Sequence, residues 1–473
     1  MQYEQAGRVR ALDAGGIGAI HRLAQHTGLV AALDQHVALF KQHLPYHESD
    51  HVLGIAYNLL CGGTCLQDIE WRRQNEVYLD ALGAQRIPDP TTAGDFCRRF
   101  READIEALQA AINETRVRVW RAQPAAFFEE AIIDADGTLA DTTGACKEGM
   151  DIAYNGVWGY HPLVVSLANT QEPLYLVNRS GNRPSAEGAA ERFEQARTLC
   201  ADAGFRRITF RGDTDFTQTR HLDGWDAAGV RFVFGCNAYA SLIQQAEALP
   251  AAAWQPLVRR PAYVVHTTPR TRPANVKEAI IVARAFKNVR LEAESVAEIP
   301  YRPTWCTTTY RLVIVRKNLS VEKGETRLFD EIRYFFYLTN DRETALPALV
   351  FLANDRCDQE NLIDQLKHGV GAIGMPVDTL LSNWAYMVMA ALAWTLKAWF
   401  ALLLPDTGRW GDAYRRDKQA VLRMEFKGFV NAFLRMPAQV VRTSRRLIFR
   451  LLAWNPWQHV FLRAVDHLPD LRH

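Results

Sequence analysis

Residues 131–138 have the sequence Ala-Ile-Ile-Asp-Ala-Asp-Gly-Thr, a short apolar run that ends in acidic side chains. Such a run predicts a β-strand that carries Asp134 and Asp136 near its end. Two more apolar runs, at 161–168 and 173–178, predict two further strands with the tight link Asn-Thr-Gln-Glu between them. We expect these three strands to follow one another in antiparallel succession.

Beyond these strands the sequence alternates between helical and extended patterns. The predicted elements are a helix from Ser185 to Gly204, a strand at 207–210, a helix at 217–228 and a strand at 231–235. The order β-β-β-α-β-α-β is that of a ribonuclease-H-like mixed sheet, in which the first and fourth strands are neighbours. This order predicts an α/β fold and places Asp136 beside Asp213, which follows the fourth strand in Phe-Arg-Gly-Asp-Thr-Asp-Phe (210–216).

A third acidic residue lies in Arg-Cys-Asp-Gln-Glu-Asn-Leu-Ile-Asp-Gln-Leu-Lys (356–367). On an α-helix, Arg356 and Lys367 would both fall within about 40° of Glu360 and share one face with it. The apolar side chains that would dock the opposite face on the sheet are Leu362, Ile363 and Leu366. Taken alone, the segment favours an ordinary exposed helix with charged side chains. Combined with the two aspartates, it favours a functional site.

Three carboxylates can share two divalent cations, which is the usual device for cutting and rejoining phosphodiesters. The sequence therefore predicts Asp136, Asp213 and Glu360 as metal ligands and catalytic residues. Oxygen ligands favour Mg²⁺, with Mn²⁺ as a substitute, over softer metals. Arg356 and Lys367 are predicted to contact DNA phosphates on either side of the scissile bond.

The chain of 473 residues is long enough for several domains. Shifts in pattern predict a helical N-terminal DNA-binding region (1–125), the first part of a catalytic core (126–237), a β-rich insertion with a basic face (238–330), the second part of the core with the glutamate helix (331–405), and a helical basic C-terminal region (406–473). Within the insertion we expect strands at 262–266, 279–283 and 311–315, and a strand at 334–338 that returns to the core.

The formal net charge is only +2, so a surface for nucleic acid must come from local clusters of basic residues. One cluster lies among the N-terminal helices and consists of Arg72, Arg73, Arg86, Arg98 and Arg99. These arginines predict a small helical DNA-binding module. A helical bundle with a solvated basic edge explains the charge equally well.

Eight cysteines without a CxxC pair predict neither a zinc site nor a disulfide framework, which is typical of a reducing cytoplasm. The polar N-terminus lacks the apolar core of a signal peptide. Residues 380–404 are almost all apolar, but Ser382 and Asn383 interrupt them. We therefore expect a cytoplasmic protein with no membrane partner, in which this segment is a buried core helix.

The motif Asp-Ala-Asp-Gly-Thr also resembles the first motif of haloacid-dehalogenase-type phosphatases. In that family Asp134 would be the nucleophile and Asp136 the general acid or base. Against this interpretation, a hairpin rather than a crossover helix is predicted after Asp136. In addition, Lys147 is the only lysine between Leu139 and Asp213, and it comes too early to clamp a phosphate.

Taken together, the motifs resemble those of bacterial insertion-sequence transposases of the DDE type. More closely, the chain is similar to the group whose ribonuclease-H-like core is interrupted by a β-strand insertion. The group's motifs D-x-D-x-T, R-x-D-x-x-F and Y-x2-R-x3-E-x6-K match at Asp134, Asp136 and Thr138, at Arg211, Asp213 and Phe216, and at Arg356, Glu360 and Lys367. The chain departs from the pattern at Ala353, which stands where the group has tyrosine.

This resemblance implies hydrolysis of phosphodiesters at the inverted-repeat ends of a transposon, followed by transfer of the 3′-hydroxyl to target DNA. It implies two Mg²⁺ ions per active site, double-stranded DNA as end and target, and a homodimer in the synaptic complex. Trp305 or Trp254 could stack on a flipped base during cleavage through a hairpin, although a core tryptophan is the simpler explanation of each. A relative that binds DNA without cutting it is the alternative from another functional class.

Overall fold

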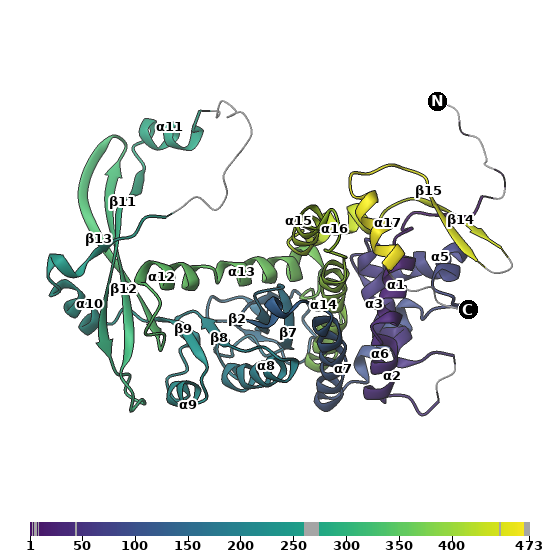
Figure 1. The fold of residues 1–473 in the computed structure, drawn as a ribbon, viewed down its shortest axis with the longest axis horizontal. Coiled ribbons are helices and arrows are strands. Elements are labelled where there is room, and N and C mark those ends of the chain that lie inside the picture. Colours follow the sequence, from purple (N-terminus) through teal and green to yellow (C-terminus); the bar gives the residue numbers. More distant parts are fainter. Residues whose placement is uncertain are drawn as a thin grey trace. The chain divides into compact units, whose positions relative to one another are not determined.

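The computed structural model describes the chain except for residues 2, 4–6, 8, 43–44, 260–273, 444–445 and 468–473. The chain forms two compact units (Figure 1). Unit 1 consists of Met1–Arg206 and Asp358–His473, and unit 2 consists of Arg207–Cys357. The five predicted regions are a finer division than this and stay a prediction. The predicted strand at 262–266 lies outside the described residues.

The sheet of unit 1 contains the first three predicted strands. They are β2 (Ala131–Gly137), β6 (Leu163–Leu167) and β7 (Glu172–Val177). β6 pairs antiparallel with both neighbours, with Asp136 opposite Val164 and Val164 opposite Leu176. The predicted antiparallel succession is therefore confirmed.

Helices make up most of the rest of unit 1. They are α1 (Ile17–His26), α2 (Leu29–His36), α3 (Glu48–Leu60), α4 (Ile69–Arg73), α5 (Glu76–Ala81), α6 (Pro90–Arg98), α7 (Glu102–Arg121), α8 (Ala189–Ala203), α13 (Cys357–Asp364), α14 (Leu380–Leu402), α15 (Gly411–Leu422), α16 (Phe426–Phe429) and α17 (Gln458–His467). The predicted cap at Ser185 is wrong, since α8 begins only after Gly188. Its predicted end at Gly204 is confirmed, because Gly204 caps the helix in the left-handed conformation with a φ of 110°.

Helix α14 is the core of unit 1 and packs against α3, α7 and β7. Among the described residues, α14 is the one helix that is long and apolar enough to cross a membrane. The apolar window that meets this criterion is entirely buried inside the protein. The expectation of a buried core helix is therefore confirmed.

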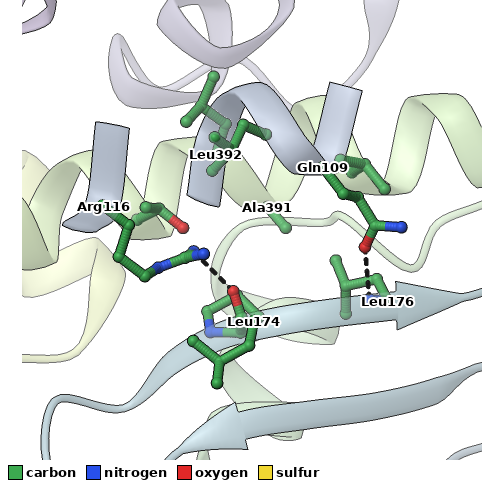
Figure 2. A pocket seen from close by; sticks show the side chains of 10 residues that line it. Gln109, Arg116, Leu174, Leu176, Ala391 and Leu392 are labelled. Carbon is green, nitrogen blue, oxygen red and sulfur yellow. Dashed lines mark hydrogen bonds between the residues drawn. The ribbon is translucent and has the colours of Figure 1, made fainter. Parts of the chain in front are cut away.

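A buried ion pair joins α7, β7 and α14. Nε of Arg116 lies 3.1 Å from Oε1 of Glu172, and the same carboxylate accepts hydrogen bonds from the indole N–H groups of Trp120 and Trp399, each at 2.9 Å. Beside it is a cavity of about 20 Å³ (Figure 2), where Gln109 and Arg116 reach from α7 toward β7. This network fixes the sheet of unit 1 to its helices.

Two small sheets complete unit 1. One has the order β3 (Ala140–Asp141), β5 (Trp158–Tyr160), β4 (Asp151–Ile152), and the other has the order β1 (Ala11–Leu12), β14 (Ala438–Arg442), β15 (Leu447–Leu451). The prediction of a helical C-terminal region is therefore wrong for β14 and β15. In β14 burial alternates from residue to residue, as expected for a strand.

Unit 2 is a mixed sheet with helices. Its strands lie in the order β10 (Gln255–Pro256), β11 (Lys287–Tyr301), β12 (Tyr310–Lys323), β13 (Thr326–Thr339), β9 (Arg231–Cys236), β8 (Ile208–Gly212). β8 and β9 are parallel, and the other pairs are antiparallel. The helices are α9 (Leu222–Ala227), α10 (Ala240–Glu247), α11 (Val276–Ala283) and α12 (Leu346–Asn354).

One prediction fails in the insertion, and one predicted boundary lies within a strand. The apolar run at 279–283 belongs to helix α11, because the Asn275 side chain caps the backbone N–H of Glu278 and starts a helix. The predicted boundary after residue 330 falls inside β13, whose last residues, 336–339, pair with β9. The insertion and the core thus share one continuous strand. The α/β class is confirmed, whereas the predicted contact of the first and fourth strands involves both units and stays a prediction.

Candidate active site

Asp134 and Asp136 lie on the same face of strand β2, because side chains two residues apart point the same way. Asp134 is opposite Ser166 and Asp136 is opposite Val164 on β6. Asp134 is completely buried, with 0% of its surface exposed. Asp136, near the end of the strand, is only partly buried. Asp136 is therefore the more accessible of the two carboxylates.

Helix α13 is attached to this face of the sheet by Gln359. Its side-chain amide donates a hydrogen bond to the carbonyl oxygen of Val164 over 3.0 Å, and its amide oxygen accepts one from the hydroxyl of Ser166. Opposite residues of an antiparallel pair share a face, so the Ser166 side chain lies on the face of Asp134 and Asp136. The next residue, Glu360, is exposed, and its segment is thus attached to β6, the strand that pairs with the strand of Asp136.

The predicted docking surface of the glutamate helix is confirmed. Leu362, Ile363 and Leu366 are all buried. Sequence reasoning missed Gln359, which is only 1% exposed. Its burial could have been predicted from its position on the helix, because at about 100° per residue it lies on the side of Ile363 and Leu366.

The prediction of one regular α-helix that carries Arg356, Glu360 and Lys367 is wrong. Arg356 lies in the turn before α13. After Asp364 the chain continues as a π-helical segment, Gln365–Gly369, in which the N–H of Val370 bonds to the carbonyl of Gln365. The wider turns of this segment change the angle per residue, so regular α-helical spacing does not reach Lys367.

Lys367 nevertheless lies beside the strand end that carries Asp136. Its ammonium group donates a hydrogen bond to the carbonyl oxygen of Leu139 over 2.6 Å. Burial lowers the pKa of Lys367 below its ordinary value, and the charges of Asp141 and Asp364 oppose this effect. The ammonium group has three N–H donors, and this hydrogen bond uses one of them.

Asp213 lies in unit 2, directly after β8. Its carboxylate accepts a hydrogen bond from the backbone N–H of Asp215 over 3.0 Å and caps the short 3₁₀ helix Thr214–Phe216. Burial raises the pKa of Asp213, and the positive charge of Arg356 opposes the rise. Asp213 and Arg356 therefore interact electrostatically within unit 2.

The three predicted ligands are divided between the units, since Asp136 and Glu360 belong to unit 1 and Asp213 to unit 2. Over the described residues, the structure contains no group of three or more His, Cys, Asp or Glu side chains arranged to hold a metal ion. The accessible carboxylates of Asp136 and Glu360 are hard oxygen donors of the type that Mg²⁺ prefers. The complete set of three ligands stays a prediction.

Neither candidate tryptophan in unit 2 is a core residue. Trp305 is 62% exposed, and the guanidinium of Arg220 lies 4.4 Å from its ring centre. Trp254 is partly buried between Arg316, at 4.1 Å, and Tyr334. The simpler explanation of a core tryptophan is therefore wrong for Trp305.

The predicted basic cluster of the N-terminal helices is largely engaged within the protein. Arg72 is buried and donates to the carbonyl of Cys61, and Arg73 pairs with Glu70. Arg98 pairs with Asp95 and Asp378, and the guanidinium groups of Arg86 and Arg99 lie over aromatic rings. These contacts fit a structural role for at least Arg72.

Comparisons with known proteins give one match along the whole chain. The profile of the family described as "Transposase DDE domain group 1" matches residues 4–473. Among solved structures, the cryo-EM structure of the piggyBac transposase synaptic complex with hairpin DNA is similar at 9% sequence identity and a TM-score of 0.34, covering 85% of this chain and 86% of that one. A likeness at this score supports no argument about fold or function. No curated protein matches the chain.

Proposed function

The chain belongs to the family described as transposase DDE domain group 1, and from this premise we propose that it cuts DNA at the ends of a mobile element. In the proposed reaction, a phosphodiester at each inverted-repeat end is hydrolysed, and the freed 3′-hydroxyl then attacks target DNA. The substrates are double-stranded DNA ends and a double-stranded target. Because two ends are cut together, a homodimer would hold them in the synaptic complex.

One observation supports the proposal most strongly. Gln359 connects helix α13 to Val164, the residue opposite Asp136, so the helix of Glu360 is fixed to β6, the strand that pairs with the strand of Asp136. We infer that Glu360 lies near Asp136 on this side of unit 1. We infer that Asp213 completes the ligand set.

The proposed cofactor is a pair of Mg²⁺ ions, for which Mn²⁺ can substitute. When bound, such a pair activates a water or hydroxyl nucleophile and stabilises the leaving oxygen. The residues of the chain would hold the ions through Asp136, Asp213 and Glu360. Arg356 and Lys367 would bind phosphates, Arg356 through a two-pronged guanidinium and Lys367 as a point charge.

The burial of Asp134 counts against the phosphatase interpretation. A nucleophilic carboxylate must reach its substrate, whereas Asp134 is completely enclosed beneath the face that α13 covers. In addition, β2 pairs antiparallel with β6, as expected if a hairpin rather than a crossover helix follows Asp136. Both features fit a structural role for Asp134.

Trp305 is the better candidate for holding a flipped base. It is 62% exposed although the guanidinium of Arg220 lies over its ring, so it can still offer aromatic surface to a base. Trp254 is less accessible, because Arg316 and Tyr334 lie against it. We propose Trp305 for this role on the basis of this difference.

The test is cleavage of DNA that contains the inverted repeats flanking the gene, with Mg²⁺ present or removed by a chelator. We expect metal-dependent nicking that Asp136→Asn, Asp213→Asn and Glu360→Gln each abolish. Asp358→Asn is the matched control, because it changes an exposed carboxylate on the helix that carries Glu360. Nicking that survives in the first three variants would overturn the site.

Two other outcomes would replace the proposed activity. Hydrolysis of a small phosphate ester that depends on Asp134 would support the phosphatase. Binding of the ends without cleavage by the natural chain, at any Mg²⁺ or Mn²⁺ concentration, would support the non-cleaving relative.

A further inference from the structure

Arg179 is a buried arginine whose hydrogen bonds all end on the backbone. It is 8% exposed. Its Nε donates to the carbonyl of His161 at 2.8 Å, its Nη1 to those of Glu187 at 2.6 Å and Pro184 at 3.2 Å, and its Nη2 to that of Ser185 at 3.0 Å. One guanidinium thus holds three carbonyls of the segment 180–188 and the carbonyl of His161.

This segment packs against the residue that follows Asp136. A Cβ atom added at Gly137 would lie 2.5 Å from Oγ of Ser185 and 2.9 Å from Nε2 of His161. The His161 ring is itself fixed, because its Nδ1 lies 2.9 Å from the carbonyl oxygen of Arg183. A carbonyl can only accept, so Nδ1 carries the hydrogen atom in the neutral ring. The backbone after Asp136 is therefore enclosed by groups that Arg179 holds in place.

The guanidinium of Arg179 is not placed to bind DNA. Burial lowers its pKa to about 10, with Glu187 opposing the change, so it stays charged at neutral pH. Each of its three nitrogen atoms already donates a hydrogen bond to a carbonyl oxygen. An arginine that binds a phosphate must instead offer its fork to solvent.

We propose that Arg179 is a positioning residue for cleavage: it holds the segment 180–188 against Gly137 and thereby fixes the carboxylate of Asp136 for the metal ions. This inference rests on the proposed function. It assigns to Arg179 an effect on the chemical step and on the metal requirement, without contact with DNA.

Lysine at this position is the most informative change. A lysine keeps the positive charge but cannot reach carbonyls on both sides with a rigid planar fork. Changes to groups that orient metal ligands typically reduce metal affinity or activity by about 10- to 100-fold. We expect Arg179→Lys to reduce the single-turnover cleavage rate at saturating DNA by this factor. We also expect it to raise the Mg²⁺ concentration needed for half of the maximal rate.

DNA binding separates this role from a phosphate contact. If Arg179 is a positioning residue, the dissociation constant for the DNA end and its dependence on salt stay unchanged in Arg179→Lys and Arg179→Gln. If it binds a phosphate, Arg179→Gln lowers the slope of log K against log salt by about 1. Arg183→Lys is the matched control, because Arg183 is an exposed arginine of the same segment that pairs with Glu187.

A second variant covers the case in which Arg179→Lys does not fold, as judged by its thermal unfolding. Gly137→Ala perturbs the same packing from the opposite side, since the new methyl group presses on Ser185 and His161. We expect the same combination of slower cleavage, higher Mg²⁺ requirement and unchanged DNA affinity.

The outcomes distinguish this inference from the proposed function. If the natural chain cleaves, Asp136→Asn does not, and Arg179→Lys and Gly137→Ala cleave normally at ordinary Mg²⁺ concentrations, the positioning role is wrong and the proposed function stands. If Asp136→Asn also cleaves normally, the proposed site is wrong and the role of Arg179 fails with it.

Discussion

The side-chain amide of Gln359 donates a hydrogen bond to the backbone carbonyl of Val164 over 3.0 Å, from helix α13 to strand β6. Val164 is the residue opposite Asp136 in the sheet. A buried amide therefore ties the helix with Glu360 to β6, the strand that pairs with the strand of Asp136. This connection between two distant parts of the sequence gives unit 1 its two proposed metal ligands.

Replacing Gln359 by leucine should leave helix α13 folded but remove the hydrogen bonds that tie it to β6. The change removes both hydrogen bonds of Gln359 and leaves the buried hydroxyl of Ser166 without this partner, which costs about 1–3 kcal/mol. We expect a lower midpoint of urea unfolding and a loss of cleavage larger than any loss of DNA affinity. Asn361→Ala, an exposed change on the same helix, should alter neither quantity. Cleavage at the natural rate in a folded Gln359→Leu variant would contradict the role assigned to this amide.

The buried pair of Arg116 and Glu172 should dominate the stability of unit 1. Glu172→Gln leaves a buried guanidinium without its counter-charge, which typically lowers the free energy of unfolding by about 3–5 kcal/mol. The exposed pair of Arg118 and Glu114 on the same helix provides the control, and Glu114→Gln should have a much smaller effect. Denaturant unfolding measures both. Equal effects of the two changes would show that the buried pair contributes no more than a surface pair.

Lys397 should make stability depend on pH. It is 1% exposed on α14, donates to the carbonyl of Leu422, and burial lowers its pKa to about 7. Between this value and the ordinary 10.5, the unfolded chain binds a proton that the folded chain does not. The free energy of unfolding therefore rises with pH in this window, by up to about 1.4 kcal/mol per pH unit from this group.

The measurement is urea unfolding from pH 7 to 10 for the natural chain and Lys397→Met. The natural chain should gain stability relative to the variant as the pH rises. Lys427→Met, which removes an exposed ammonium from α16, should leave the pH dependence unchanged. Parallel curves for the natural chain and Lys397→Met would show that the buried lysine is not neutral in the folded protein.

Much of this fold follows from patterns in the sequence. The strands around Asp136 and the buried helix α14 were predictable because their apolar runs have the length and spacing of buried elements. The run at 279–283 was misleading. Its β-prone residues lie in a helix that Asn275 caps, and β-propensity depends strongly on such surroundings.

In the candidate site, too, some features could be predicted from the sequence and others could not. Asp136 and Glu360 were singled out by motifs, and their role as metal ligands stays a prediction. The π-helical segment that carries Lys367 could not be predicted, because one extra residue per turn leaves no mark in a pattern of charged residues. Gln359 carries no charge and belongs to no motif, so its bond to Val164 becomes visible only in the folded chain.

The most direct test of the central claim is anomalous diffraction from crystals of the protein bound to a cleaved inverted-repeat end and soaked in Mn²⁺. The account predicts two manganese positions about 4 Å apart, coordinated by carboxylate oxygens of Asp136, Asp213 and Glu360. Manganese bound without any one of these three side chains would contradict it.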